Sequence, residues 1–369
     1  MMNILRENDL RFALGIEKAQ AGGDYTIAFL GGSITQGSLS SSDQTCYAYL
    51  VYQWMAKRFP EARMHYVNAG IGGTSSYFGV ARMDEDVLIY RPDLVIVDFS
   101  VNDEPNEFFQ ETYEGVISKL VHAECEPAVL ALNNVFYNSG VTAEPYHSKV
   151  TDAYGIGHVS AKKNIYKKIR SGEIKREEIT PDGLHPNDRG HAMLADQVIE
   201  YLDQWITSVD VPHLAINRNP VPTVTPNRFA NAKRYTIANA TSLKGGVSYR
   251  LQGFVADTEE KQGHLDLWKN GWIGRNIGDK ITFTFEGRTL GVQYRKTIHK
   301  PAPIADCIVD RKMTKPITLD GNFKETWGDC LYIEPIILDD VPKTHTVEIE
   351  LAIAEHPGEV FYLNGLIIS

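Results

Sequence analysis

The sequence predicts an α/β domain with a parallel sheet, followed by an antiparallel β-sandwich of the jelly-roll type. Two observations carry this prediction. Up to about residue 208, short apolar runs of strand-forming residues alternate with longer segments of helical spacing, which is typical of a parallel sheet flanked by helices. From about residue 233, helical spacing nearly disappears and short β-rich pieces separated by turn residues take over, as in a sandwich.

Composition suits a globular protein of two domains. The chain has 369 residues, of which 43% are hydrophobic and 23% charged. Its net charge of -10, without a Lys/Arg run, argues against a nucleic-acid partner. No apolar stretch is long enough to span a membrane, and Met1–Ala21 has no apolar core of a signal peptide. We therefore expect a cytoplasmic protein without a membrane partner, and leave homo-oligomer formation open.

Cysteine and histidine spacing predicts neither a metal nor a cofactor. Cys46, Cys125, Cys307 and Cys330 show no CxxC spacing. Two of them could pair within the second half, but reduced thiols fit a cytoplasmic protein better. The histidines, among them His122, His147 and His158, lack zinc-ligand spacing.

The first domain is predicted over residues 1–208. Strands are expected at Tyr25–Leu30, Met64–Asn68, Leu94–Phe99 and Ala128–Leu132. Helices are expected at Asn3–Gln20 and Tyr47–Arg58, in a stretch ending at Tyr90, near Thr112–Cys125 and at Asn187–Ile206.

A linker is predicted over 209–232, because Pro212, Pro220, Pro222 and Pro226 fall where little periodicity remains. The sandwich is predicted over 233–369. Its β-rich pieces are Ile281–Phe285, Thr289–Tyr294, Ala305–Val309, Leu331–Ile337, Thr346–Leu351 and Val360–Ile368.

A serine after the first predicted strand is the first candidate for chemistry. The strand ends at Gly31 and Gly32, and Ser33 follows where the chain must turn. Open parallel sheets keep their ligands at the carboxyl ends of the strands, so this turn places the hydroxyl at a ligand-binding edge. The G-x-S-x-G nucleophile elbow is absent. A serine after glycines is also an ordinary turn residue.

The loops after the second and third predicted strands offer hydrogen-bond donors. The glycines of Asn68–Thr74 let backbone N–H groups approach a ligand. A dinucleotide fingerprint fails, because Ser75 stands where its third glycine belongs. The Asn102 amide, at the end of the third strand, could donate to an oxyanion. An Asn-Asp pair in this position is also typical of a helix cap or an Asx-turn.

Asp182 and His185 stand three residues apart, ahead of the last predicted helix of the first domain. A general base must reach the nucleophile, and a carboxylate must hold its imidazole in the correct tautomer. Pro186 fixes His185 in an extended conformation, which helps to aim the ring. The same pair, taken alone, would be a helix cap beside a surface histidine. The order of the four segments, however, predicts one common site at the edge of the sheet.

Over about residues 25–206, this order of motifs resembles the SGNH (GDSL-type) hydrolase superfamily. The form G-G-S-I-T-x-G is similar to the branch that contains carbohydrate esterases. Gly32 replaces the Asp of G-D-S-L, and Ser100 stands where the family often has glycine. Neither departure removes a group that the family's reaction needs.

The resemblance implies a role for each motif. Ser33 is implied to be the nucleophile, with Asp182 and His185 as the triad acid and base. The implied oxyanion hole consists of the Ser33 N–H, the N–H of Gly73, with Gly72 as the fallback, and the Asn102 side chain.

The second domain resembles the jelly-roll carbohydrate-binding modules attached to acetyl esterases. Trp268, Trp272 and Trp327 are its candidate sugar-contacting residues, although most aromatic side chains of a sandwich belong to its core. The two domains together resemble carbohydrate esterase family seventeen, which acts on acetylated β-mannan. This implies a serine esterase that removes O-acetyl groups from hemicellulose-derived oligosaccharides, mannan first and xylan second, through an acyl-enzyme.

Two other functions remain open. A lipase or thioesterase of the same superfamily would prefer long acyl chains. A non-catalytic carbohydrate-binding protein would have lost its hydrolase chemistry, against which the intact Ser33, Asn102, Asp182 and His185 argue.

Overall fold

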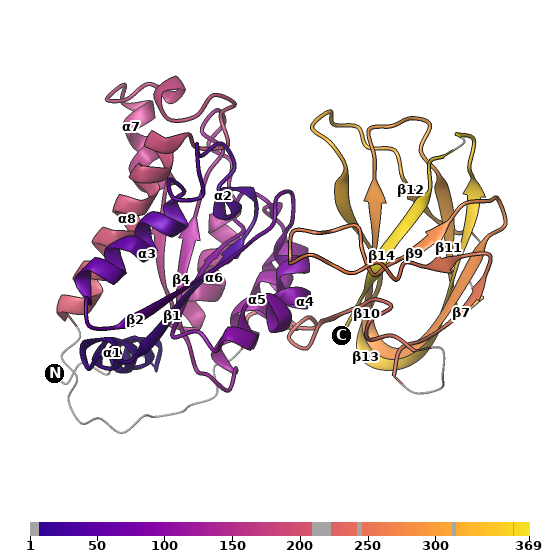
Figure 1. The fold of residues 1–369 in the computed structure, drawn as a ribbon, viewed down its shortest axis with the longest axis horizontal. Coiled ribbons are helices and arrows are strands. Elements are labelled where there is room, and N and C mark those ends of the chain that lie inside the picture. Colours follow the sequence, from indigo (N-terminus) through magenta and orange to yellow (C-terminus); the bar gives the residue numbers. More distant parts are fainter. Residues whose placement is uncertain (1–6, 209–222, 242–245, 312–314, 357) are drawn as a thin grey trace. The chain divides into compact units, whose positions relative to one another are not determined.

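The structure, a computed structural model, describes residues 7–208, 223–241, 246–311, 315–356 and 358–369. The chain divides into two compact units, Met1–Ala230 and Asn231–Ser369 (Figure 1). The first contains a parallel five-stranded sheet with helices, and the second an antiparallel sheet of nine strands. The predicted fold class is therefore confirmed. Part of the predicted linker, 209–222, lies outside the described residues, and residues 223–230 belong to the first unit.

The parallel sheet has the strand order β2-β1-β3-β4-β5. Its strands are β1 (Asp24–Gly31), β2 (Arg63–Gly70), β3 (Leu94–Asp98), β4 (Ala128–Asn133) and β5 (Gly157–Ser160). The register pairs Gly31 with Gly70 on one side and with Asp98 on the other, so three strands end at the same edge. β5 was not predicted, because it has four residues and two of them are only half-buried.

Helices cover both faces of the sheet. The helices α1 (Glu7–Gln20), α3 (Tyr47–Arg58) and α8 (Asp188–Ser208) share one core with it, and α4 (Ser76–Asp86), α5 (Glu107–Val121) and α6 (Glu144–Ala153) follow one another on the opposite face. Shorter helices are α2 (Ser33–Gln36), α7 (Lys167–Arg170), Leu88–Tyr90, Lys162–Tyr166 and Arg176–Glu178. The first part of the helix predicted from Asn3 lies outside the described residues.

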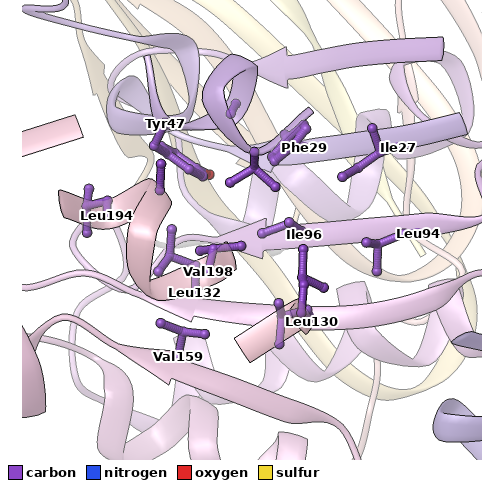
Figure 2. Close-up of a cluster of buried hydrophobic side chains, with 14 of the residues drawn as sticks. Ile27, Phe29, Tyr47, Leu94, Ile96, Leu130, Leu132, Val159, Leu194 and Val198 are labelled. Carbon is purple, nitrogen blue, oxygen red and sulfur yellow. The ribbon is translucent and has the colours of Figure 1, made fainter. Parts of the chain in front are cut away.

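Alternate residues of the central strands build the core beneath α3 and α8 (Figure 2). The side chains of this core come from β1, β3, β4 and β5 and from the helices above them, and they include Ile27, Phe29, Leu94, Ile96, Leu130, Leu132, Leu194 and Val198. All of these are at most 1% exposed. The residues between them on the strands are buried against the other helical layer, and this is why the strands form nearly continuous apolar runs.

The second unit is a sheet folded over its own core. Its strands are β6 (Lys233–Tyr235), β7 (Ser248–Gln252), β8 (Val255–Ala256), β9 (Trp272–Gly274), β10 (Lys280–Lys296), β11 (Ile304–Val309), β12 (Ile317–Asp320), β13 (Cys330–Ile353) and β14 (Phe361–Ile368). The first part of β10 pairs with β7 and the last part with β14, on either side of a register shift at Gly287–Thr289. Four of the predicted pieces are therefore halves of two long strands, β10 and β13.

Two further features concern the whole described chain. The four cysteines are free thiols. Within the described ranges, no helix combines the length and the apolar character needed to cross a bilayer.

Leu130→Ala should lower the free energy of unfolding by about 2–5 kcal/mol, because it leaves a cavity in the core of Figure 2. The matched change Leu14→Ala, at a side chain that is 48% exposed, should shift it by less than about 0.5 kcal/mol. Urea unfolding of both variants measures the difference. Equal effects at the two positions would contradict this account of the core.

Candidate active site

Ser33 is the first residue of α2, the single helical turn that follows β1. Its hydroxyl oxygen lies 2.9 Å from Nε2 of His185. The residue is 8% exposed, so its side chain is sheltered without being sealed off. The structure thus joins two side chains that are 152 positions apart in the sequence.

Asp182 orients the ring of His185. Its Oδ2 lies 2.7 Å from Nδ1 of the imidazole, and its Oδ1 accepts the backbone N–H groups of Leu184 and His185 at 2.9 and 2.8 Å. Partial burial opposes ionisation, but the hydrogen bonds from the ring and the backbone outweigh it and lower the pKa of Asp182. An ionised carboxylate favours the tautomer with the proton on Nδ1, which leaves Nε2 free to accept from Ser33.

A second set of hydrogen bonds ties α8 to the segment that follows α2. Asp188, the first residue of α8, accepts the backbone N–H and the hydroxyl of Ser41 at 2.7 and 2.6 Å and the hydroxyl of Thr45 at 2.9 Å. One turn later, Nε2 of His191 lies 3.2 Å from the carbonyl of Ser38. These bonds hold the start of α8 against the segment that follows α2, in addition to the contact between Ser33 and His185.

Asn102 lies against the backbone just before Ser33. It sits in the turn after β3, where its N–H donates to the carbonyl of Phe99 at 3.0 Å. A Cβ atom on Gly32 would stand 2.2 Å from Oδ1 and 2.9 Å from Nδ2 of Asn102. Only glycine at position 32 leaves room for this close approach. The structure therefore brings Asn102 to the site, as the sequence predicted.

The glycine loop after β2 lies on the other side of the serine. A Cβ on Gly72 would be 3.7 Å from that of Ser33, and the Gly72 N–H donates to Oε1 of Gln36 at 2.6 Å. Gly73 follows with φ of +69°, in the left-handed region that favours glycine. Sequence analysis missed Gln36. Its position three residues after Ser33, one turn along α2, was the available signal.

A buried polar network lies behind the serine turn. Oδ2 of Asp98, at the end of β3, accepts from Asn134 at 2.9 Å and from the Thr35 hydroxyl at 3.4 Å. Burial raises the pKa of Asp98 to about 7 against the effect of these two donors, and the charge of Asp103 adds to the rise. Sequence analysis did not single out Asp98, because this residue ends an otherwise apolar strand.

Asp103, next to Asn102, links three helices. Its Oδ1 accepts the N–H of Ser76 at the start of α4, at 2.8 Å, and its Oδ2 lies 2.9 Å from Nε2 of His147 in α6. The ring of His147 stacks on that of Tyr113 in α5, with centroids 3.7 Å apart. Neither Asn102 nor Asp103 is the N-cap of the helix that follows, since Asn106 caps α5, and His147 is a core residue.

The three predicted sugar-contacting tryptophans differ in their surroundings. Trp272 is fully buried against Tyr249 and Phe283, so it packs in the core of the second unit and has no face free for a sugar; that expectation is corrected. Trp268 is half-buried, with its ring edge-on to Tyr362. Trp327 is 60% exposed. Among the described residues, no group of three or more His, Cys, Asp or Glu side chains is arranged to hold a metal.

The free energy of unfolding of Asp98→Asn, relative to that of the wild type, should rise with pH. The raised pKa means that the folded state holds the Asp98 proton more tightly than the unfolded chain does. In the wild type, the stability gained from protonating Asp98 is complete below about pH 4 and is lost as the pH rises through about 7. Asparagine has no charge to bury. Urea unfolding at about pH 5 and about pH 8 should show the variant gaining on the wild type, and the exposed change Asp203→Asn serves as the control. A pH-independent difference would contradict the account.

Residues 29–193 match the family described as GDSL-like Lipase/Acylhydrolase. The acetylxylan esterase of Geobacillus stearothermophilus is 25% identical over 218 residues, which cover 51% of this chain and 98% of that relative. This match agrees with the resemblance to the SGNH (GDSL-type) superfamily that the sequence motifs indicate.

Two solved structures match almost the whole chain. A two-domain esterase (CEX) active on acetylated mannans is 43% identical, with a TM-score of 0.92 and coverage of 98% of this chain and 95% of that one. A second structure of such an esterase, co-crystallised with mannopentaose, is 42% identical, with a TM-score of 0.89 and coverage of 97% and 94%. The chain therefore belongs with these two-domain esterases and is a carboxylic ester hydrolase, and its residues 29–193 form a GDSL-like acylhydrolase domain.

Proposed function

We propose that the protein is a serine esterase that removes O-acetyl groups from hemicellulose-derived oligosaccharides, acetylated β-mannan first and xylan second. The hydrogen-bonded series Ser33, His185 and Asp182, with Asn102 beside the serine, carries the proposal. The substrate class is supported by the esterase active on acetylated mannans, which matches both units, and by the acetylxylan esterase, whose match covers about half of the chain.

His185 acts first as a general base. Its Nε2 takes the proton of the Ser33 hydroxyl, and the serine oxygen attacks the acetyl carbonyl. Asp182 stabilises the imidazolium that forms. The same ring then gives its proton to the sugar oxygen, so that the deacetylated sugar leaves and an acetyl-serine remains. A water molecule deprotonated by His185 attacks this ester, and acetate and free Ser33 result.

The proposed oxyanion hole has donors from three loops. The Ser33 N–H belongs to the first residue of α2, and the first N–H groups of a helix have no acceptor within it. The Asn102 amide approaches from the end of β3. Gly73 is the preferred glycine donor, because the N–H of the fallback Gly72 already binds Gln36. Such donors stabilise the charge on the carbonyl oxygen during attack.

The second unit is proposed to contact the oligosaccharide through Trp268 and Trp327. Trp327 is the better placed of the two, since 60% of it is exposed and its flat face can cover a sugar ring. Its ring is held edge-on by Phe323 at a centroid distance of 4.9 Å, which limits its motion. Trp272 has no part in this proposal.

Asn102→Ala should lower kcat by about 10²–10³-fold, because one oxyanion donor is lost. Gly32→Ala should act in the same direction, since its Cβ would displace the Asn102 amide. Steady-state kinetics with p-nitrophenyl acetate, together with thermal unfolding to confirm the fold, measure both effects. An unchanged kcat in Asn102→Ala would rule out its proposed role.

Acetate release from a panel of acetylated manno- and xylo-oligosaccharides tests the function itself. The wild type should release acetate, faster from the mannan series, and Ser33→Ala should release almost none. A preference for long acyl chains in a p-nitrophenyl ester series would instead indicate a lipase or thioesterase. Sugar binding without acetate release by the wild type would indicate a non-catalytic binding protein.

A further inference from the structure

A short segment within the predicted linker packs on the helices beside the site. We call this segment, residues 224–229, the strap. It belongs to the first unit and ends just before the second unit begins at Asn231. Its partners are α4 and α5.

Glu114 of α5 binds the start of the strap. The side chain is fully buried, at 0% exposed. Its two oxygens accept the backbone N–H groups of Val224 and Thr225, each at 2.8 Å, and the hydroxyl of Thr225. The Tyr154 hydroxyl donates to the same carboxylate at 3.1 Å. A buried carboxylate needs such donors, and most of these come from the strap.

Glu111, one turn earlier on α5, binds the end of the strap. It is 4% exposed, and it accepts the backbone N–H of Arg228 at 2.7 Å and two nitrogens of its guanidinium at 2.7 and 2.9 Å. This is the two-pronged arrangement that makes arginine–carboxylate pairs strong and directional. Two buried carboxylates on one helix thus fix both ends of the strap.

Phe229 adds an apolar contact between the strap and both helices. It is 1% exposed, and its ring centroid lies 5.1 Å from that of Tyr77 in α4 and 5.7 Å from that of Phe108 in α5. Tyr77 and Phe108 also contact each other, at 5.4 Å. A Cβ on Gly115 would lie 3.0 Å from the Cβ of Phe229, so α5 has a glycine where the strap crosses it.

The proposed oxyanion donors Gly73 and Asn102 lie in the loops that lead into α4 and α5, the two helices that the strap joins. α4 begins at Ser76, three residues after Gly73, and the Ser76 N–H is bound by Asp103, the neighbour of Asn102. Further along α4, the Arg82 guanidinium donates to the carbonyl of Gly31 at 3.1 Å, at the end of the nucleophile strand. A shift of α4 therefore moves the glycine loop, the Asn102 turn and the end of β1.

We propose that the strap is a positioning element for the oxyanion hole. By packing Phe229 between Tyr77 and Phe108 and binding Glu111 and Glu114, it fixes α4 against α5, and so holds the Gly73 and Asn102 donors around one oxygen. The inference rests on the proposed function, because it assigns the strap to that same site. A truncation after Ser208 would remove the strap as well as the second unit, so it could not test the role of the second unit alone.

The test compares Phe229→Ala with Val224→Ala in the full chain. Val224 is a matched control, because its side chain is 41% exposed and only its backbone N–H binds Glu114. Active-site titration with a fluorophosphonate counts the competent serines. Per titrated site, Phe229→Ala should lower kcat by roughly tenfold on both p-nitrophenyl acetate and acetylated manno-oligosaccharide, with KM for the small ester within about twofold of wild type. Val224→Ala should behave as wild type.

Phe229→Leu and Thr225→Val give milder changes and keep the test usable if Phe229→Ala fails to fold. Leucine should restore much of kcat, and loss of the Thr225 hydroxyl should lower kcat on both substrates. A fall in Tm with unchanged kcat per titrated site would reduce the strap to a stability element and overturn the proposal. Loss confined to the oligosaccharide would also overturn it.

The variant Ser33→Ala separates the two levels of inference. Full turnover in Ser33→Ala would defeat the proposed function. An inactive Ser33→Ala, together with a wild-type kcat in the strap variants, would overturn only the positioning role proposed for the strap.

Discussion

The position of the site depends on successive connections between strands that cross opposite faces of the parallel sheet. After β1 the chain passes through α3 on one face to reach β2, and it returns through α4 on the other face to reach β3. Connections that leave neighbouring strands on opposite faces open a crevice between the strand ends. Ser33 follows β1 and Asn102 follows β3, so both stand at this crevice. His185 enters it on the loop ahead of α8, whose first turn is tied to the serine segment through Asp188.

This arrangement brings polar groups into the interior, and most of them have dedicated partners. Asp103 is shared between the start of α4 and His147, and Glu114 is shared between Tyr154 and the strap. Asp98 differs from these. Within the described residues, its Oδ1 has no hydrogen-bond partner, and this agrees with the upward shift of its pKa. Protein sites commonly keep such an unfavourable group where the surrounding packing can hold it.

Local signals predicted every strand of the first sheet except β5 and singled out Ser33, Asp182 and His185, which the structure brings together, but long-range pairing was not predictable. β1, β3 and β4 are buried on both faces, so their apolar runs mark them clearly. Ser33, Asp182 and His185 each lie in a short recognisable motif. Trp272 could not be recognised as a core residue, because composition does not separate a buried ring from an exposed one. The strap lies partly in a proline-containing stretch, and its partners Glu111 and Glu114 are more than 100 residues earlier.

Gly32, which stands where G-D-S-L has Asp, is what allows Asn102 to lie where it does. Any side chain at position 32 would begin with a Cβ in the space that the Asn102 amide fills. A carboxylate there would also place negative charge next to the oxygen on which charge develops during attack, and charges of the same sign repel strongly where water is scarce. With glycine, the amide lies directly against the peptide that precedes Ser33. The departure from G-D-S-L thus fits the proposed oxyanion hole, in which Asn102 would stand close to Ser33 and no acidic neighbour would oppose the developing charge.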